Sequence, residues 1–332
     1  MTQHPPRIGL VGAGGIARAH LPNLLRLGDV FVYSEEGAPE LVAAYGGVVV
    51  HSLDELLARV DVVDVVVPTF AHAEIVRAAL AAGKPVISEK PLALTDADAS
   101  DLVARAEHAG IPLYPAHVVR FFPEYVRLKQ AVDSGLLGDL AVLRLSRSGA
   151  FPTRAAWYAD HALSGGIIMD QMIHDLDMAR WLAGEVVRVS AVTAGIPDAD
   201  NPVQAAHVLL THASGAISQV SGLWGPQHLA FTTEYSVTGT LGCLSHSSAA
   251  ERNYRSDLAA SEAVDGLLPR IDPAEDPYYL ELREYLGAIL GGQVPRVSAA
   301  DGAIAVAIAN AALKSLETGQ PTDLPVLSEV LA

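Results

Sequence analysis

The 332-residue sequence lacks most features that mark secreted, membrane and nucleic-acid-binding proteins. Its single cysteine, Cys243, excludes an internal disulfide, and no apolar run reaches the roughly 20 residues of a membrane span. The 22 Lys and Arg residues stand against 38 Asp and Glu, and the net charge of −16 disfavours binding to nucleic acid or to anionic membranes. The amino terminus enters an apolar strand without a signal-peptide core. These absences predict a cytoplasmic protein with a small-molecule partner.

Clusters of metal-binding side chains are also missing. No group of Cys, His and acidic residues has the spacing of a metal site, so we expect no metal. Cys243 is expected to be inert in the core. The three methionines Met169, Met172 and Met178 are expected to pack in the core rather than to bind a ligand.

Two different patterns of predicted elements meet near residue 120. Between Arg7 and His117, short β-branched runs alternate with helix-period segments, which is typical of a doubly wound parallel sheet. Later segments such as "AAHVLLTHASGAISQVSGLW" predict a large, open, mostly antiparallel sheet flanked by helices. The fold class is therefore α/β plus α+β. The length and the 50% hydrophobic content also favour two domains, which we place at 1–120 and 121–332.

A glycine-rich segment, "GLVGAGGIARAH", directly follows the first predicted strand. Gly12, Gly14 and Ala17 have the spacing G-x-G-x-x-A, with Gly15 and Ile16 between them. The first glycine permits a tight turn, the second lets the backbone approach a pyrophosphate, and the small third residue lets helix and strand pack closely. The segment predicts a dinucleotide-binding Rossmann domain over 1–120. The alternative is a turn that holds no ligand.

The second predicted strand ends in "VFVYSEEG". A Rossmann domain usually carries an acid there that accepts the ribose hydroxyls, whereas this chain has Ser34, followed by Glu35 and Glu36. No lysine or arginine lies between Arg26 and Arg59 to hold a 2′-phosphate. The segment therefore favours NAD(H) and leaves NADP(H) open. Alternatively, the glutamates merely begin the next helix, whose dipole favours them.

The ends of the fourth and fifth strands are expected to border the same crevice, because ligands bind at the carboxyl ends of a doubly wound sheet. The residues assigned to the cofactor there are Pro68, Thr69, His72, Glu89 and Lys90. Lys90 can also donate a hydrogen bond and a positive charge to the oxygen of a reacting alcohol or carbonyl. His72 is equally well explained as a surface residue at the start of a helix.

The segment "SGGIIMDQMIHDLDMARWLAG" places Asp170 and His174 four residues apart, on one face of a predicted helix that also carries Asp177. The surrounding residues are apolar, and a buried carboxylate is costly unless it is paired. A structural pair, in which Asp170 fixes one rotamer of a core histidine, fits this segment as well as a catalytic pair does.

Taken together, these motifs resemble the Gfo/Idh/MocA oxidoreductase family. The resemblance covers essentially the whole chain, from "GAGGIA" and "GKPVISEKPLALT" to "DPYYLELREYLGAIL". It implies a Rossmann domain coupled to a large open sheet, and oxidation of sugars, inositols or related hydroxyl compounds with a nicotinamide cofactor. Lys90, Asp170 and His174 match the family's catalytic positions. His174 would take the hydroxyl proton, Asp170 would orient the imidazole ring, and Lys90 would polarise the oxygen.

The resemblance also implies further contacts, each with an alternative. His117 and Arg120 match the stretch where the family's last Rossmann strand passes the nicotinamide, and we assign both to the substrate. The alternative for each is a structural role without contact to a ligand. Asp177 matches a position that either holds a substrate hydroxyl or lies behind the site. Trp157 and Tyr158 either wall a sugar pocket or simply pack at the domain junction. Ser34 departs from the acid found in many relatives, which puts the choice of cofactor in doubt.

Three functions fit these residues. The leading hypothesis is a dehydrogenase or reductase that transfers hydride between NAD(P) and a hydroxyl or carbonyl of a sugar, inositol or related polyol. A rival enzyme would retain NAD(H) and redox-cycle it during epimerisation, elimination or glycosidic cleavage. A non-catalytic ligand-sensing regulator is the third, and the intact lysine, aspartate and histidine argue against it.

The second domain, 121–332, is expected to bind the substrate and to mediate oligomerisation. Its strand segments include apolar stretches such as "VVRVSAVTAG" and "AISQVSGLW". An open sheet with one uncovered apolar face tends to find a partner. We therefore expect a homodimer or homotetramer formed through the outer face of this sheet.

Overall fold

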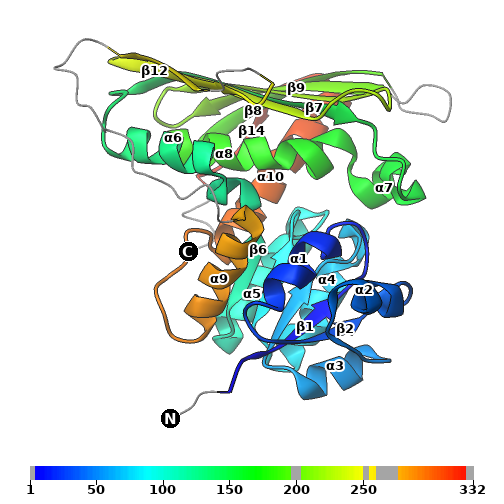
Figure 1. The fold of residues 1–332 in the computed structure, drawn as a ribbon. Coiled ribbons are helices and arrows are strands. Elements are labelled where there is room, and N and C mark those ends of the chain that lie inside the picture. The colour runs from blue at the N-terminus through cyan, green and yellow to red at the C-terminus, as the bar shows by residue number, and fades with distance from the viewer. Residues whose placement is uncertain (1–3, 196–202, 250–253, 259–275, 327–332) are drawn as a thin grey trace. The chain divides into compact units, whose positions relative to one another are not determined.

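The computed structural model describes residues 4–195, 203–249, 254–258 and 276–326 (Figure 1). The chain divides into two compact units, the first comprising Met1–Phe121 and Pro273–Ala303 and the second Phe122–Asp272 and Ile304–Ala332. We expected 121–332 to form one domain, whereas a late segment of the chain joins the first unit. The reason is visible in the core of that unit, where Leu282, Tyr285 and Leu286 are buried with residues of the first strands.

The first unit contains a six-stranded parallel sheet with the order β3-β2-β1-β4-β5-β6. This is the strand order of the dinucleotide-binding Rossmann fold, so the predicted doubly wound sheet is confirmed. The strands are β1 (Arg7–Val11), β2 (Asp29–Tyr33), β3 (Val48–Val49), β4 (Val62–Val65), β5 (Val86–Glu89) and β6 (Leu113–Ala116). The helical elements are α1 (Ala17–Leu24), α2 (Ala38–Tyr45), α3 (Leu53–Arg59), α4 (Thr69–Ala81), α5 (Asp96–Ala109), η1 (Val118–Phe121) and α9 (Pro277–Ile289).

Local sequence explains where these elements begin and end. All four residues of β4 and of β5 are buried, as expected for central strands covered on both faces. Helix α5 begins after Thr95, whose hydroxyl accepts a hydrogen bond from the Asp98 amide. It ends at Gly110, whose φ of 62° is accessible to glycine at little cost. Both ends of α5 are therefore capped by residues that suit them.

The second unit contains an eight-stranded sheet with the order β13-β12-β11-β7-β10-β9-β8-β14. All neighbouring strands are antiparallel except β7 and β10, which are parallel, so the predicted mostly antiparallel sheet is confirmed. The strands are β7 (Leu140–Ala150), β8 (Val186–Ala194), β9 (Gln204–His212), β10 (Ile217–Gly225), β11 (Thr232–Gly239), β12 (Gly242–Ser247), β13 (Tyr254–Leu258) and β14 (Thr322–Asp323). The helical elements are α6 (Pro123–Asp133), η2 (Ala156–Ala159), α7 (His161–Ser164), η3 (Ile168–Met172), α8 (Ile173–Ala183) and most of α10 (Ala299–Thr318).

Helices α6, α8 and α10 cover one face of this sheet (Figure 1). Met169, Met172 and Met178 are fully buried there, which confirms that they pack in the core. Gly222 on β10 permits the close approach, because an added Cβ would lie 2.5 Å from the Met172 Cγ. Helix α10 ends before Gly319, which has a φ of 66°.

By length and composition, α10 also passes as a membrane-spanning helix, with a mean hydropathy of 1.3. More than half of its apolar stretch (56%) is nevertheless buried inside the protein. Among the described residues this is the only such helix, and its burial is that of a core helix.

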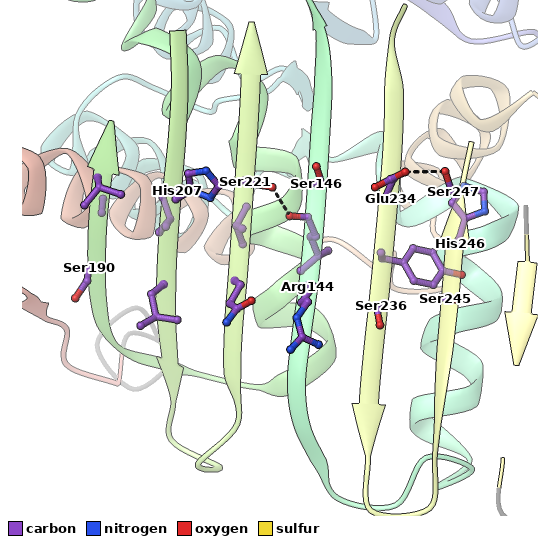
Figure 2. Close-up of a pocket in the computed structure, with 18 residues that line it drawn as sticks. Arg144, Ser146, Ser190, His207, Ser221, Glu234, Ser236, Ser245, His246 and Ser247 are labelled. Carbon is purple, nitrogen blue, oxygen red and sulfur yellow. Dashed lines mark hydrogen bonds between the residues drawn. The ribbon is translucent and has the colours of Figure 1, made fainter. Parts of the chain in front are cut away.

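The opposite face of the sheet is covered by no helix among the described residues (Figure 1). It holds a hollow of about 870 Å³. Many of the side chains around this hollow are small or polar, and they include Arg144, Ser146, Ser190, His207, Ser221, Glu234, Ser236, Ser245 and Ser247 (Figure 2).

The composition of this face bears on two expectations. We expected an apolar face, and exposed Val192, Leu209 and Ile217 lie on it. The strand alternation turns Val208, Val220 and Trp224 toward the helices, and hydroxyl-bearing residues lie between the exposed apolar ones. Cys243, expected in the core, is only half-buried, and its Sγ lies 3.3 Å from the Thr238 hydroxyl oxygen.

Candidate active site

The glycine turn between β1 and α1 has the geometry of a phosphate-binding turn. Gly12 has a φ of 113°, and an added Cβ would lie 2.8 Å from the backbone of Val66, so only glycine fits. Gly14 is exposed, with open space where its side chain would be. Ile16 provides no side-chain cap to α1, so the first amides of the helix can face an anion.

The loop after β2 lies beside this turn. An added Cβ on Gly37 would lie 3.5 Å from the Ala13 Cβ. Ser34 is half-buried, and Glu35 and Glu36 are exposed. Helix α2 begins only at Ala38, so the alternative that the glutamates begin this helix is wrong. The loop thus presents a hydroxyl and two carboxylates next to the glycine turn.

His72 links the loops that follow β4 and β5. Its side chain is buried, which rules out the surface position considered from the sequence. Its Nδ1 lies 2.7 Å from the Pro91 carbonyl oxygen and its Nε2 lies 2.9 Å from that of Val67. Burial lowers the pKa of His72, although both carbonyl contacts act in the opposite direction. Pro68 and Thr69, at the start of α4, form part of the loop that His72 holds.

Glu89, the last residue of β5, uses its carboxylate in contacts within the first unit. Its Oε1 lies 3.1 Å from the His20 Nε2, and its Oε2 accepts a 3.0 Å hydrogen bond from the Lys90 amide. These contacts use both carboxylate oxygens, so a direct contact between this carboxylate and a cofactor stays a prediction without structural support. Lys90 itself is half-buried at the carboxyl end of β5.

His117 and Arg120, at the end of β6, are both buried. The Arg120 Nη1 donates to the Arg296 carbonyl oxygen at 2.9 Å and to the Asp301 carboxylate at 3.3 Å. The Arg296 guanidinium in turn donates to the Arg120 carbonyl oxygen at 3.1 Å. These contacts attach the late segment of the chain to the first unit, which favours the structural role for Arg120.

In the second unit, Asp170 and His174 lie on one irregular helix rather than on the regular α-helix that we expected. Asp170 belongs to the π-helical turn η3, and α8 begins one residue before His174. Four residues make slightly more than one α-turn and slightly less than one π-turn, so the two residues still share a side of the helix. Both are half-buried, and Asp177 is buried further along α8. A π-helical turn inside an α-helix is frequent at functional sites.

A buried ion pair fixes the rotation of α8 against the sheet. The Arg147 Nε and Nη2 on β7 donate to the two carboxylate oxygens of Asp175 at 2.9 and 3.0 Å. Burial lowers the pKa of Arg147, but the charge and hydrogen bonds of Asp175 more than offset it and raise that pKa above its usual range. Because Asp175 faces the sheet, Asp170, His174 and Asp177 project from another side of the helix.

Trp157 and Tyr158, in η2, stack on each other with ring centroids 3.9 Å apart. The Arg154 Nη2 donates to the Tyr158 hydroxyl at 3.2 Å. Each ring therefore covers one face of the other. The role of these two rings as walls of a sugar pocket stays a prediction. Among the described residues, no group of three or more His, Cys, Asp and Glu is arranged to hold a metal.

The buried polar groups beneath Lys90 were not predicted from the sequence. His20 on α1 contacts Asp64 on β4 as well as Glu89, and none of these side chains is more than 7% exposed. A signal was present, because Asp64 interrupts the apolar run "VDVVDVVV" and a carboxylate inside a buried strand needs a partner. The partner could not be identified because it lies 44 residues away.

Comparisons with known proteins place the chain in a family. Residues 6–117 match the oxidoreductase family with an NAD-binding Rossmann fold, and residues 125–245 match a Gfo/Idh/MocA carboxyl-terminal domain. The chain is 30% identical to myo-inositol 2-dehydrogenase from Thermotoga maritima, over 94% of this chain and 96% of that protein. It is 31% identical to inositol 2-dehydrogenase 1 from Saccharopolyspora erythraea, over 96% of both.

A solved structure of a probable dehydrogenase from Thermotoga maritima is 28% identical and superposes with a TM-score of 0.78. The match covers 98% of this chain and 99% of that one. With both domains matched and the relatives aligned over nearly their full length, the chain belongs to the Gfo/Idh/MocA family of NAD-binding oxidoreductases.

Proposed function

We propose that this enzyme is an NAD(H)-dependent dehydrogenase that transfers hydride between nicotinamide and a ring hydroxyl or carbonyl of an inositol or related sugar. The observation that carries the proposal is the support of Lys90: Glu89 before it and Pro91 after it are each bonded to a buried histidine. Such restraint suits a residue that must meet a reacting oxygen in one geometry. The inositol 2-dehydrogenases among the relatives support the choice of substrate class.

The mechanism assigns one task to each side chain. His174 accepts the proton of the reacting hydroxyl, since an imidazole titrates near cellular pH. Asp170 orients the ring and stabilises its charged form. Lys90 donates a hydrogen bond to the reacting substrate oxygen while the charge on that oxygen changes. Asp177 binds a further substrate hydroxyl. When bound, the nicotinamide supplies the hydride acceptor.

The cofactor is assigned to the segments that follow β1, β2 and β4 in the first unit. The amides at Gly14, Gly15 and Ile16 bind the pyrophosphate. Ser34 and Glu35 bind the adenosine ribose, and the negative charge of Glu35 favours NAD(H) over NADP(H). Pro68 and Thr69 border the nicotinamide half. Among the described residues, no lysine or arginine lies between Arg26 and Arg59.

A retained, redox-cycling NAD(H) is the second candidate function, because Lys90 and His174 would serve it equally. The regulator is disfavoured, since Lys90, Asp170 and His174 are all present. The cytoplasmic location, the homo-oligomer and the absence of nucleic-acid and membrane partners stay predictions.

A substrate panel separates these functions. Purified protein is mixed with inositols, sugars and sugar acids, each with NAD⁺ or NADP⁺, and NAD(P)H is followed by its near-ultraviolet absorbance. Net reduction of the cofactor supports the dehydrogenase. Substrate turnover without net cofactor change supports redox cycling, and saturable binding without turnover supports the regulator.

A further inference from the structure

His20 occupies a fully buried position between two carboxylates. Its Nδ1 lies 2.8 Å from the Asp64 Oδ2, and its Nε2 lies 3.1 Å from the Glu89 Oε1. Ionised carboxylates only accept hydrogen bonds, so both ring nitrogens must donate, which requires the imidazolium form. Burial alone would lower the pKa of His20, but the charges and hydrogen bonds of Asp64 and Glu89 outweigh burial and raise it well above its usual value.

The charge of His20 also determines the state of Glu89. Burial alone would raise the pKa of Glu89, yet the hydrogen bond and charge of His20, followed by the charges of Lys90 and His72, lower it. The other titratable neighbours lie on α9: they are Tyr278, whose ring centroid is 5.8 Å from that of His20, and Glu281. The pKa of Glu281 is raised well above the usual value by burial and by the charge of Glu89. His20 is therefore the buried cation that keeps Glu89 ionised.

The ionised Glu89 restrains the backbone on the amino-terminal side of Lys90, where its Oε2 accepts the Lys90 amide at 3.0 Å. His72 restrains the other side, with its Nδ1 2.7 Å from the Pro91 carbonyl oxygen. A continuous set of contacts thus runs from Asp64 through His20 and Glu89 to the backbone of Lys90. Because His20 lies on α1, it also connects the helix of the glycine turn with Lys90.

We propose that His20 is a positioning residue for hydride transfer: its imidazolium holds Glu89 against the Lys90 amide and so fixes Lys90 at the end of β5. This inference rests on the proposed function, because it assumes that Lys90 acts on the substrate oxygen. His20 acts only through Glu89 and contacts neither substrate nor cofactor.

The test compares His20→Gln, Glu89→Gln and the double variant, with the best substrate of the panel. Each single variant should lower kcat about tenfold or more, because small displacements of a catalytic group are costly. The dissociation constant of NADH, measured by fluorescence, should stay within about threefold, as expected when only the chemical step is impaired. The double variant should lose no more than Glu89→Gln alone, since the two residues act as one unit.

Two further measurements separate positioning from general destabilisation. Asn23→Ala is the matched control on α1, because it removes the 2.8 Å hydrogen bond from Asn23 to Asp276 and leaves Glu89 untouched. It should lower the melting temperature and leave kcat unchanged. In His20→Gln, loss of the cation should raise the pKa of Glu89, so kcat should gain a new fall on the acid side of its pH profile.

Several results would overturn the inference. These are a kcat of His20→Gln within twofold of the wild type, multiplicative losses in the double variant, or an unchanged pH profile. If His20→Gln does not fold, Glu89→Gln decides alone, and full activity in that variant refutes the inference. Full activity in Lys90→Ala would instead refute the proposed function, whereas an impaired Lys90→Ala beside a fully active His20→Gln refutes only this inference.

Discussion

Lys90 and His174 are the two side chains whose replacement should separate chemistry from cofactor binding. Lys90→Ala and His174→Asn should each lower kcat by about 10² or more, the usual scale for removing positioned acid–base chemistry. The affinity for NADH should stay within a few-fold, because both residues are assigned to the substrate oxygen. Steady-state kinetics and NADH fluorescence titration measure the two quantities.

The matched controls are Lys314→Ala and His108→Asn, which change the same residue types at exposed positions on α10 and α5. Both should retain wild-type kcat. Wild-type turnover in Lys90→Ala or His174→Asn would remove that residue from the mechanism.

Glu35 tests the choice of cofactor. Glu35→Arg should raise the ratio of kcat/KM for NADP⁺ to that for NAD⁺ by about tenfold or more, because a guanidinium can pair with the 2′-phosphate that a carboxylate repels. Glu40→Arg, in the first turn of α2, makes the same change of charge away from the ribose and should leave the ratio unchanged. A wild-type enzyme that prefers NADP⁺ would contradict the assignment.

At the scale of elements, α9 packs against the Rossmann sheet and carries a buried acid, Glu281. Glu281 is fully buried, and the Tyr285 hydroxyl on the same helix donates to the Pro115 carbonyl oxygen at 2.9 Å. Burial, followed by the charge of Glu89, raises the pKa of Glu281. A carboxyl whose folded-state pKa is raised binds its proton more tightly in the folded state, so its contribution to stability is lost as the pH rises above its ordinary value.

Glu281→Gln should therefore remove the loss of stability that the raised pKa of Glu281 causes as the pH increases. Below about pH 4.5, the ordinary carboxyl value, both proteins carry a neutral side chain and their relative stability should not change with pH. Above it, the melting temperature of the wild type should fall progressively relative to the variant. Parallel curves across this range would show that Glu281 is ionised in the folded protein.

The elements that the sequence predicted are those with a strong local signal. The glycine turn and the apolar strands each depend on neighbouring residues, and the structure contains both. The π-helical turn at Asp170 was not predictable, because it packs against Gly222, 50 or so residues away on β10, and no local pattern encodes that contact. The pairing of Asp64 with His20 likewise depends on β4 and α1 meeting in the core.

At the scale of the whole molecule, the uncovered face of the second sheet is the expected oligomer interface. It holds the hollow of about 870 Å³, together with exposed Val192, Leu209 and Ile217. Light scattering at micromolar concentration should give two or four times the 34.8 kDa chain mass. Arg144→Glu, on this face, should weaken the assembly, whereas Arg59→Glu on α3 should not. A monomeric wild-type mass would refute the interface.

The most direct measurement of the central claim follows hydride itself. The enzyme is incubated with NAD⁺ and an inositol that carries deuterium on its ring carbons, and the released cofactor is analysed by mass spectrometry. We expect NADH that has gained one deuterium, in equal amount to the ketone formed. Product formation without deuterated NADH in solution, or no reaction with any compound of the panel, would contradict the assignment as a dehydrogenase.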